Sequence, residues 1–364
     1  MGESGPRNHR AGRIQLQALI CDDPLFARGN FCRICGTTSC DLNIRAAGFT
    51  GVAGSAVLRA FFISLSESRS LRVLAERSSI GQRTSSRFVA GTQVEDAVRV
   101  TQNLNSAGLS VSIDNLGENV TTPEEARAAA GLYRQLLSEI AARKLNANVS
   151  VKLTHMGLDV DPQLAYDNVR ALVSQAASMQ PKNFVRVDME GSPYTDRTLS
   201  LVRDLHRKPE NRGCVGAVVQ SYLQRSESDV ADLVREKIRI RLCKGAYQEP
   251  ADIAFQAKSE VDKNYIKLMK VLLQSGIYHG LATHDENLIR EAQAFARREQ
   301  IPRNTFEFQM LHGIRRDLQR SLSRDGWRMR VYVPFGTEWY PYLMRRLAER
   351  PANVGFVVKN LFRQ

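Results

Sequence analysis

Residues 109–125 read LSVSIDNLGENVTTPEE and contain one complete transition from a strand to a helix. The apolar run Leu109–Ile113 has the length and composition of a buried strand. The polar stretch Asp114–Glu118 follows it, and Thr122 then stands where it can cap a helix that starts at Pro123. The stretch therefore predicts a strand, a polar loop at the carboxyl end of that strand, and a long helix.

The same unit recurs along the chain. A helix is expected from Val94 to about Ala107, and segments with helical periodicity precede and follow each later strand candidate. Together with Ser110–Ile113, the strand candidates are Asn148–Leu153, Phe184–Met189, Val215–Ser221, Ile238–Lys244, Gly280–His284, Phe306–Leu311 and Arg330–Pro334. About eight short strands that alternate with helices over ~260 residues predict an α/β fold of the (βα)8 TIM-barrel type, rather than an open doubly wound sheet. Their β-branched composition fits strands that are buried on both faces.

Composition and charge limit the classes of function. The chain has 364 residues, of which 43% are hydrophobic and 24% charged, and a net charge of +13. The positive charge is spread along the chain, which disfavours nucleic acid as a partner and fits an acidic substrate or an anionic membrane surface. No apolar stretch reaches the roughly 20 residues of a membrane span, and no signal peptide is recognisable. We therefore expect a cytoplasmic protein, with a peripheral contact to the inner face of the cell membrane left open.

The chain before the barrel is expected to have two parts. Residues 1–56 show no sustained periodicity and predict a disordered extension, or a stretch outside the native protein that a misplaced start codon has added. Residues 57–87 carry apolar side chains at helical spacing and predict two short N-terminal helices that pack on the barrel, with a basic membrane-contacting helix as the alternative. The barrel domain itself is expected to span residues 88–364.

The cysteines do not predict a metal site. Four of the six lie in the first forty residues, including the C-x-x-C pair Cys32 and Cys35. The second C-x-x-C pair of a zinc ribbon is absent from the sequence, so zinc is disfavoured. Cys214 and Cys243 lie in apolar runs and are expected to be buried, reduced thiols.

A short helix is predicted near the C-terminus, from Pro341 to the residue before Pro351. The side chains that share one face of this helix are Tyr342, Arg345, Arg346 and Glu349. Two adjacent guanidinium groups match a carboxylate with forked pairs of donors. The alternative is a solvated helix whose Arg–Glu pairs contribute little.

In a barrel of this type the active site forms where the strands end. The residues at the predicted strand ends are mostly polar: Asp114, Glu118, Lys152, His155, Asp188, Glu190, Gln220, Arg241, Lys244, Tyr247, Thr283, His284, Asp285, Gln309, Leu311, His312 and Tyr332. Lys152, together with the two C-terminal arginines, suits a substrate carboxylate. A second group suits a ligand with phosphates and a polar aromatic ring, because amide and guanidinium groups bond ring heteroatoms while lysine and histidine offset phosphate charge: Arg241, Lys244, Gln220, Thr283 and His284. The sequence has neither a G-x-G-x-x-G turn after the first strand nor a G-x-S-x-G nucleophile elbow.

Three blocks of the sequence resemble the signature sequences of the proline dehydrogenase family. They are Arg241–Tyr247 (RLCKGAY), Phe306–Gly313 (FEFQMLHG) and Tyr342–Glu349 (YLMRRLAE), and the similarity runs from about Leu58 to the C-terminus. The resemblance implies a distorted (βα)8 barrel with FAD at the carboxyl ends of the strands and a final helix over the barrel mouth. It also implies oxidation of L-proline to Δ1-pyrroline-5-carboxylate by hydride transfer to FAD, the first step of proline catabolism to glutamate. A quinone would then accept the electrons.

The resemblance also assigns roles to individual residues. Those that hold or cover the substrate are expected to be Lys152, Asp188, Arg345, Arg346, Ala246, Tyr247, Leu311, Tyr332 and Tyr342. The expected FAD contacts are Gln220, Arg241, Cys243, Lys244, Gly245, Ala246, Thr283, His284 and Glu349, and no metal is expected. Cys243 departs from the family pattern, which often has valine at this position. Because the chain ends shortly after Glu349, we expect a separate pyrroline-5-carboxylate dehydrogenase to act on the product.

Two alternatives remain open on the sequence. A dehydrogenase of hydroxyproline or of another cyclic imino acid would need the same clamp for the carboxylate. A barrel that binds an anionic metabolite without redox chemistry would share the cationic strand ends but would carry no flavin.

Overall fold

The structure of the protein, a computed structural model, describes residue 78 and residues 85–349, and gives the side chains of the latter stretch up to residue 344. The predictions for residues 1–56 and for all but a few residues of 57–87 lie outside the described part. The proposed domain boundaries therefore stay predictions.

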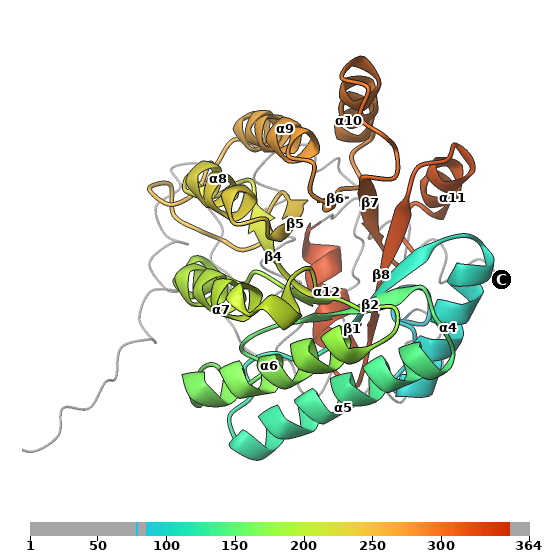
Figure 1. Cartoon of the computed structure of the whole chain (residues 1–364), viewed down its shortest axis with the longest axis vertical. Coiled ribbons are helices and arrows are strands. Elements are labelled where there is room, and N and C mark those ends of the chain that lie inside the picture. Colours follow the sequence, from blue (N-terminus) through green and yellow to red (C-terminus); the bar gives the residue numbers. More distant parts are fainter. Residues whose placement is uncertain (1–77, 79–84, 350–364) are drawn as a thin grey trace, which may run out of the picture. The chain divides into compact units, whose positions relative to one another are not determined.

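Eight parallel strands form a closed barrel in which each strand pairs with the next and the last pairs with the first. The strands are β1 (Ser110–Asn115), β2 (Ala147–Val151), β3 (Val185–Val187), β4 (Val215–Gln220), β5 (Arg239–Cys243), β6 (His279–Ala282), β7 (Phe306–Leu311) and β8 (Met329–Phe335). Each predicted strand overlaps one of these, with ends that differ by at most two residues. The predicted barrel is confirmed, and Figure 1 shows its strands inside a ring of helices.

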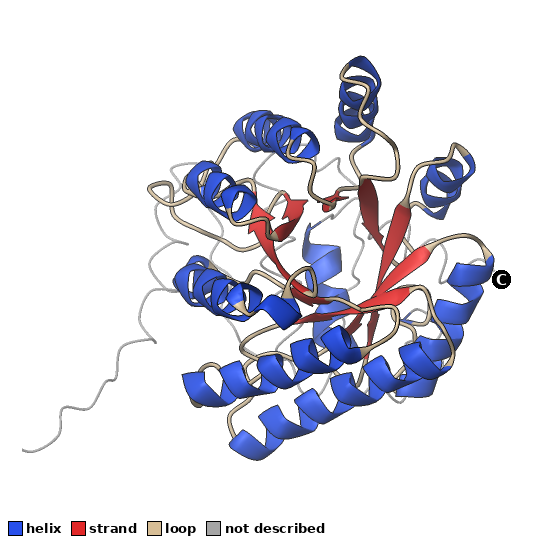
Figure 2. Ribbon diagram, in the orientation of Figure 1, coloured by secondary structure: helices blue, strands red, loops and turns tan. Residues whose placement is uncertain are grey.

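A helix follows every strand, as the repeating unit predicts. The helices are α4 (Val94–Ser106), α5 (Pro123–Ala142), α6 (Pro162–Ser178), α7 (Thr195–Arg207), α8 (Ser226–Arg235), α9 (Lys258–Gln274), α10 (Glu286–Arg298), α11 (Arg316–Arg324) and α12 (Trp339–Glu349). Two short 3-10 turns, η2 (Ser192–Tyr194) and η3 (Pro209–Asn211), flank α7. Figure 2 shows the blue helices surrounding the red strands.

The start of α5 shows how local sequence sets these boundaries. Thr122 Oγ1 accepts a hydrogen bond from the Glu125 amide at 3.2 Å, and the Glu125 carboxylate accepts one from the Thr122 amide at 3.3 Å. Pro123 occupies the first turn, where its missing N–H removes no helical hydrogen bond. This capping box confirms the predicted helix start.

The apolar core lies between the strands and the helices. In β1, Val111 and Ile113 are fully buried in that core, whereas Ser112 and Asp114 on the opposite face hydrogen-bond inside the barrel. The strands are buried on both faces, as expected, but the inner face is largely polar. A polar interior is stable here because side chains from different strands satisfy one another's hydrogen bonds.

The C-terminal helix starts earlier than predicted. Helix α12 begins at Trp339, so Pro341 is its third residue and not its first. This displacement is tolerated because the amide groups of the first turn have no partner within the helix. The start of α12 belongs to an apolar cluster that consists of Val89, Leu116, Trp339, Tyr340, Tyr342 and Leu343. Because Leu116 directly follows β1, this cluster fixes α12 at the carboxyl end of the barrel.

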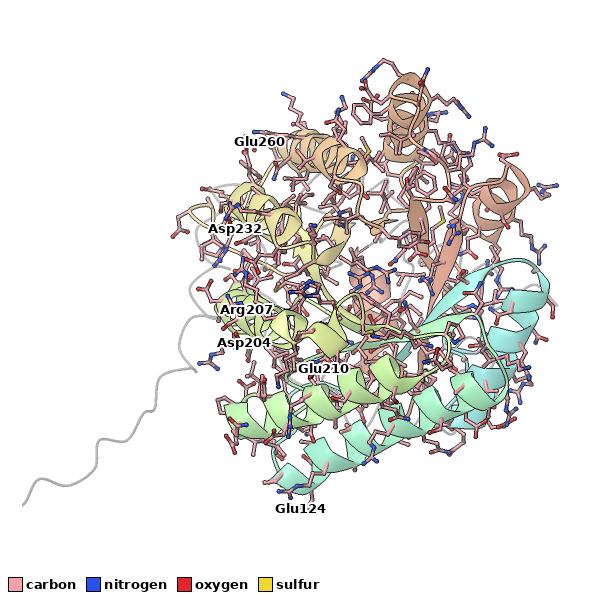
Figure 3. The ribbon with its side chains drawn as sticks, viewed as in Figure 1. Glu124, Asp204, Arg207, Glu210, Asp232 and Glu260 are labelled. Atoms are coloured by element: carbon pink, nitrogen blue, oxygen red, sulfur yellow. The ribbon has the colours of Figure 1, made fainter. Side chains whose placement is uncertain are left out.

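Charged side chains surround the barrel on the outside. Figure 3 labels several of them on the outer helices and loops: Glu124, Asp204, Arg207, Glu210, Asp232 and Glu260. In the stretch from residue 85 to 349, no helix combines the length and the apolar character that crossing a bilayer requires.

Candidate active site

Arg241 of β5 lies at the centre of the barrel interior and joins four other strands or strand ends. Its Nη1 donates to Asp188 Oδ1 at 2.7 Å and to Ser150 Oγ at 3.1 Å. Its Nε donates to Gln309 Oε1 at 2.6 Å, and its Nη2 donates to Ser112 Oγ at 3.2 Å. A guanidinium group with this many fixed acceptors holds one orientation.

Asp188, which directly follows β3, fixes a tyrosine as well. Its Oδ1 accepts from Ser150 Oγ at 2.9 Å, and its Oδ2 accepts from the Tyr332 hydroxyl at 2.8 Å. The Arg241 guanidinium carbon lies 5.1 Å from the centre of the Tyr332 ring. Burial and the nearby carboxylates hold the pKa of Tyr332 well above its usual range, so the hydroxyl remains a donor. Asp188 is therefore a buried anion that orients both Arg241 and Tyr332.

Lys152 lies just beyond β2 and forms an ion pair with Asp114 of β1. Its Nζ is 3.0 Å from Asp114 Oδ2, and Asp114 Oδ1 also accepts from the Tyr133 hydroxyl at 3.1 Å. Burial opposes the charge on Lys152, but the carboxylates of Asp114, Asp188 and Glu118 outweigh burial and raise the pKa of Lys152. Lys152 is therefore a permanent cation, and its side chain retains some exposure to solvent.

Three predicted cofactor residues lie at the ends of β4 and β6, the strands on either side of β5. Gln220, the last residue of β4, is 3% exposed and donates from Nε2 to the Met189 carbonyl at 3.4 Å. Its Oε1 is buried without a hydrogen-bond partner in the part of the chain that the structure describes. Thr283 follows β6 and is buried, and His284 Nε2 accepts from the Leu311 amide at 3.0 Å. A buried acceptor without a partner is costly unless a ligand supplies a donor.

Lys244 is held by two carboxylates. Its Nζ lies 2.5 Å from Asp262 Oδ1 and 2.9 Å from Asp285 Oδ2. Burial alone would raise the pKa of both carboxyl groups, but hydrogen bonds and charge attraction from Lys244 lower them below their usual values. The charge on Lys244 is already balanced in this arrangement, so a phosphate would have to compete with both carboxylates.

The loop after β5 contains the remaining members of the first signature block. Gly245 has φ +111°, and a Cβ atom there would lie 2.2 Å from the Tyr222 ring, so glycine is required. Ala246 and Tyr247 follow on the exposed part of the loop, and Tyr247 is 39% exposed. Cys243 is a free thiol that is partly exposed, so its predicted burial is wrong; it is the last residue of β5 and lies at the carboxyl end of the barrel.

The remaining predicted site residues belong to β7, where Leu311 pairs in register with Tyr332 of β8, and to α12. Leu311 ends β7 and is partly buried. Tyr342 lies in the apolar cluster at the start of α12. The backbones of Arg345, Arg346 and Glu349 belong to α12, but their side chains lie beyond the described part. Their predicted positions on one helical face thus remain a prediction.

Sequence reasoning missed Ser112, Tyr133 and Ser150, and it placed Asp114 and Gln309 at strand ends without assigning either of them to a ligand. The available signal was the alternation of small polar and apolar residues in β1 and β2, which marks one face of each strand as polar. Tyr133 gave no such signal because it belongs to the helix α5.

Cations, carboxylates and a tyrosine thus converge at the carboxyl ends of the strands, which is where (βα)8-barrel enzymes have their active sites. Among residues 85–349, no group of three histidine, cysteine or carboxylate side chains is placed to hold a metal ion. The family model described as proline dehydrogenase matches residues 97–359. The chain belongs to the proline dehydrogenase family.

Curated relatives agree with this assignment. Proline dehydrogenase 1 of Bacillus subtilis is 40% identical over 310 residues, which cover 85% of this chain and 100% of the relative. Proline dehydrogenase of Deinococcus radiodurans is 39% identical over 280 residues, which cover 76% of this chain and 89% of the relative.

Solved structures share the fold. Proline utilization A from Bdellovibrio bacteriovorus, inactivated by N-propargylglycine, superimposes with a TM-score of 0.72 at 24% identity, over 83% of this chain and 37% of that chain. A mutant of proline utilization A from Bradyrhizobium japonicum gives a TM-score of 0.64 at 24% identity, over 76% of this chain and 32% of that chain. The chain spans about a third of the length of these larger proteins, and the likeness shows the barrel fold.

Proposed function

We propose that this protein oxidises L-proline to Δ1-pyrroline-5-carboxylate, with FAD as the hydride acceptor and a quinone as the final electron acceptor. Membership of the family supports proline as the substrate. The observation that carries the proposal furthest is the permanent cation Lys152 at the barrel mouth, next to the buried Arg241–Asp188–Tyr332 network.

Lys152 would bind the substrate carboxylate together with Arg345 and Arg346. The Asp114 carboxylate orients its ammonium group and leaves other donors of that group for an anion, since an ammonium has three. Burial of such a clamp strengthens its attraction for a carboxylate because the local dielectric constant is low. The clamp would thereby place the proline ring at the strand ends.

The Arg241 network would set the orientation of the substrate ring. Tyr332 cannot turn freely because its hydroxyl is bonded to Asp188 and its ring lies against Arg241. A fixed wall and a fixed clamp restrict the substrate to few orientations, which lowers the entropic part of the barrier. Leu311, Ala246, Tyr247 and Tyr342 are proposed to complete the cover.

The donor set fits a flavin nucleotide. Gln220 Oε1, which has no partner among the described residues, would accept from a ring N–H, while Arg241, Thr283 and His284 offer polar contacts in β5 and after β6. Bound FAD would supply the chemistry by accepting a hydride from C5 of proline. Lys244 fits least well, since two carboxylates already balance it. Cys243, Gly245 and Glu349 remain proposed contacts on the strength of the resemblance.

The proposal also covers the final electron acceptor and the location of the protein in the cell. A membrane quinone would require the protein to approach the bilayer, and a net charge of +13 favours reversible binding to anionic lipid. A pyrroline-5-carboxylate dehydrogenase would consume the product. We propose no nucleic acid partner.

Anaerobic spectroscopy of the purified protein tests the proposal. We expect the absorbance of a bound flavin, bleaching on addition of L-proline, and recovery on addition of a soluble quinone. Faster bleaching by hydroxyproline than by proline would favour the other imino acid as substrate. A colourless protein that binds proline would overturn the redox function, and reoxidation by oxygen but not by quinone would overturn the quinone.

A further inference from the structure

A pocket with a volume of about 360 Å³ opens at the amino end of the barrel, opposite the site described above. We call it the amino-end pocket, and its lining residues are Gly213, Arg239, Tyr278, Arg328 and Arg330. All of them lie just before a strand or in its first residues, at β4, β5, β6 and β8. Three of the five lining residues are arginines, and they come from the starts of β5 and β8, which are distant in sequence.

Two of these arginines lie against aromatic rings. The guanidinium carbon of Arg239 is 4.8 Å from the centre of the Tyr278 ring and 4.2 Å from that of Phe184. That of Arg328 is 5.5 Å from the centre of the Tyr278 ring. Arg239 Nε donates to the Tyr278 carbonyl at 3.3 Å, but within residues 85–349 neither arginine forms an ion pair with a described carboxylate side chain. Contact with an aromatic ring orients a guanidinium group but does not cancel its charge.

The third arginine is paired, and its partner is shared. Arg330 is 9% exposed, and its Nε donates to Glu307 Oε1 at 2.7 Å. Glu307 also accepts from the Tyr278 hydroxyl at 2.8 Å, so one carboxylate serves both lining residues. Among the described residues, Glu307 is thus the one carboxylate bonded to the pocket lining, and it already accepts from both Arg330 and Tyr278.

A further buried cation adds to this excess. Arg186 of β3 is 2% exposed, and its Nη1 donates to the carbonyl groups of Ala217 and Arg239, both at 2.9 Å. Its Nε has no partner among the described residues. Burial, together with the charges of Arg241 and Arg239, lowers the pKa of Arg186. Positive charges that repel one another near a low-dielectric interior are stabilised when an anion binds.

We propose that the amino-end pocket binds a small oxyanion with two negative charges, either a phosphate group or a dicarboxylate. Both ligands match the forked N–H donors of arginine. The exposed Arg328 and the partly buried Arg239 would contribute these donors. The volume of the pocket lies in the range of small-ligand sites, roughly 300 to 1,000 Å³. This site is separate from the proposed oxidation of proline, because its residues lie at the other end of the strands.

Titration calorimetry on the purified full-length protein tests this site. Inorganic phosphate and succinate are titrated separately at constant ionic strength, with sodium chloride as the balancing salt. We expect each chain to bind one ligand saturably. The ligand with the lower Kd identifies whether the site is for a phosphate group or for a dicarboxylate. In Arg328→Gln, which alters an exposed side chain, the Kd should rise about ten-fold because one charge-assisted contact is lost.

Two further variants make the outcome decisive. Arg297→Gln removes a charge at the same end of the barrel, where Arg297 lies 5.9 Å from the Trp327 ring and outside the pocket lining, so its Kd should match that of the wild type. Arg239→Lys keeps the charge but loses the fork, and it should bind more weakly than the wild type. The absence of saturable binding, or equal Kd values in the Arg328 and Arg297 variants, would overturn the proposal.

Discussion

Arg241 Nη1 lies 2.7 Å from Asp188 Oδ1 in the interior of the barrel, although the two residues are 53 positions apart in the chain. Both side chains are nearly inaccessible to water. A buried pair of this kind contributes little over an apolar pair, but the loss of one partner leaves the other charge buried and unbalanced. The pair therefore makes the barrel interior sensitive to single substitutions.

We expect Asp188→Ala to lower the free energy of unfolding by roughly 3–5 kcal/mol, because Arg241 loses its anion and Tyr332 loses its acceptor. Urea unfolding followed by circular dichroism measures this loss. Asp229→Ala is the matched control: Asp229 pairs with Arg225 at 2.8 Å, but Arg225 is 39% exposed and can be hydrated. The Asp229→Ala variant should lose about 1 kcal/mol of the free energy of unfolding. Equal losses in the two variants would contradict a special role for the central pair.

We expect Arg345→Met and Arg346→Met each to lower kcat/KM for proline by ~30- to several-thousand-fold, since a bound carboxylate would lack a charge-assisted partner. Flavin content should stay unchanged, because the proposed flavin contacts come from other strands. Steady-state kinetics and the flavin-to-protein absorbance ratio check the two parts. Arg127→Met on the exposed face of α5 is the control and should leave kcat/KM nearly unchanged. Near-wild-type kinetics in both α12 variants would contradict the proposal that these arginines bind the substrate carboxylate.

Stability should fall as the pH drops below about 6.5, and His279 is one cause. Its Nδ1 accepts from the Ile240 amide at 2.9 Å, so the folded state requires a neutral ring. Burial and the charges of Arg186 and Arg239 lower its pKa to about 3. Between that value and 6.5 the unfolded chain binds a proton that the folded chain does not. This difference lowers the free energy of unfolding by up to about 1.4 kcal/mol per pH unit as the pH falls.

His279→Asn isolates this contribution, because the amide oxygen of asparagine can accept from the Ile240 amide without titrating. Urea unfolding at pH 5.0, 5.5, 6.0 and 6.5 measures the slope of stability against pH. We expect the slope to be shallower in the variant by about 1 kcal/mol per pH unit. Burial lowers the pKa values of His155 and His312 to about 4, so these two residues should account for the pH dependence of stability that remains in the variant. Identical slopes in the two proteins would exclude His279 as a source.

We expect Gly245→Ala to destabilise the protein by roughly 1–3 kcal/mol and to reduce activity, because φ is +111° and the new methyl group would meet the Tyr222 ring. Gly131→Ala is a control of opposite sign. Gly131 lies in α5 with open space around its Cβ position, so alanine should stabilise the helix by about 0.5–1 kcal/mol. Thermal unfolding of both variants measures the effects. A stabilised Gly245 variant would show that the loop can adopt another conformation.

The sequence by itself determined the eight strands, the order of the helices and the polar strand ends. These features depend on local patterns: apolar runs such as Leu109–Ile113, the Thr122–Glu125 capping box, and the turn residues between them. Parallel strands in sequence order then bring their carboxyl ends to one side of the sheet. The set of candidate residues could therefore be written down without coordinates.

Only the tertiary structure decided which of these residues act together. Arg241 contacts Asp188, Gln309 and Ser112 because barrel closure and strand stagger bring those side chains to one level of the interior. The same geometry paired Lys244 with Asp262 and Asp285, so that two carboxylates balance its charge. It also gathered arginines at the amino end, from strands whose sequences carry no common motif. Side-chain pairing across 50 or more residues depends on the shape of the closed sheet, which no local pattern encodes.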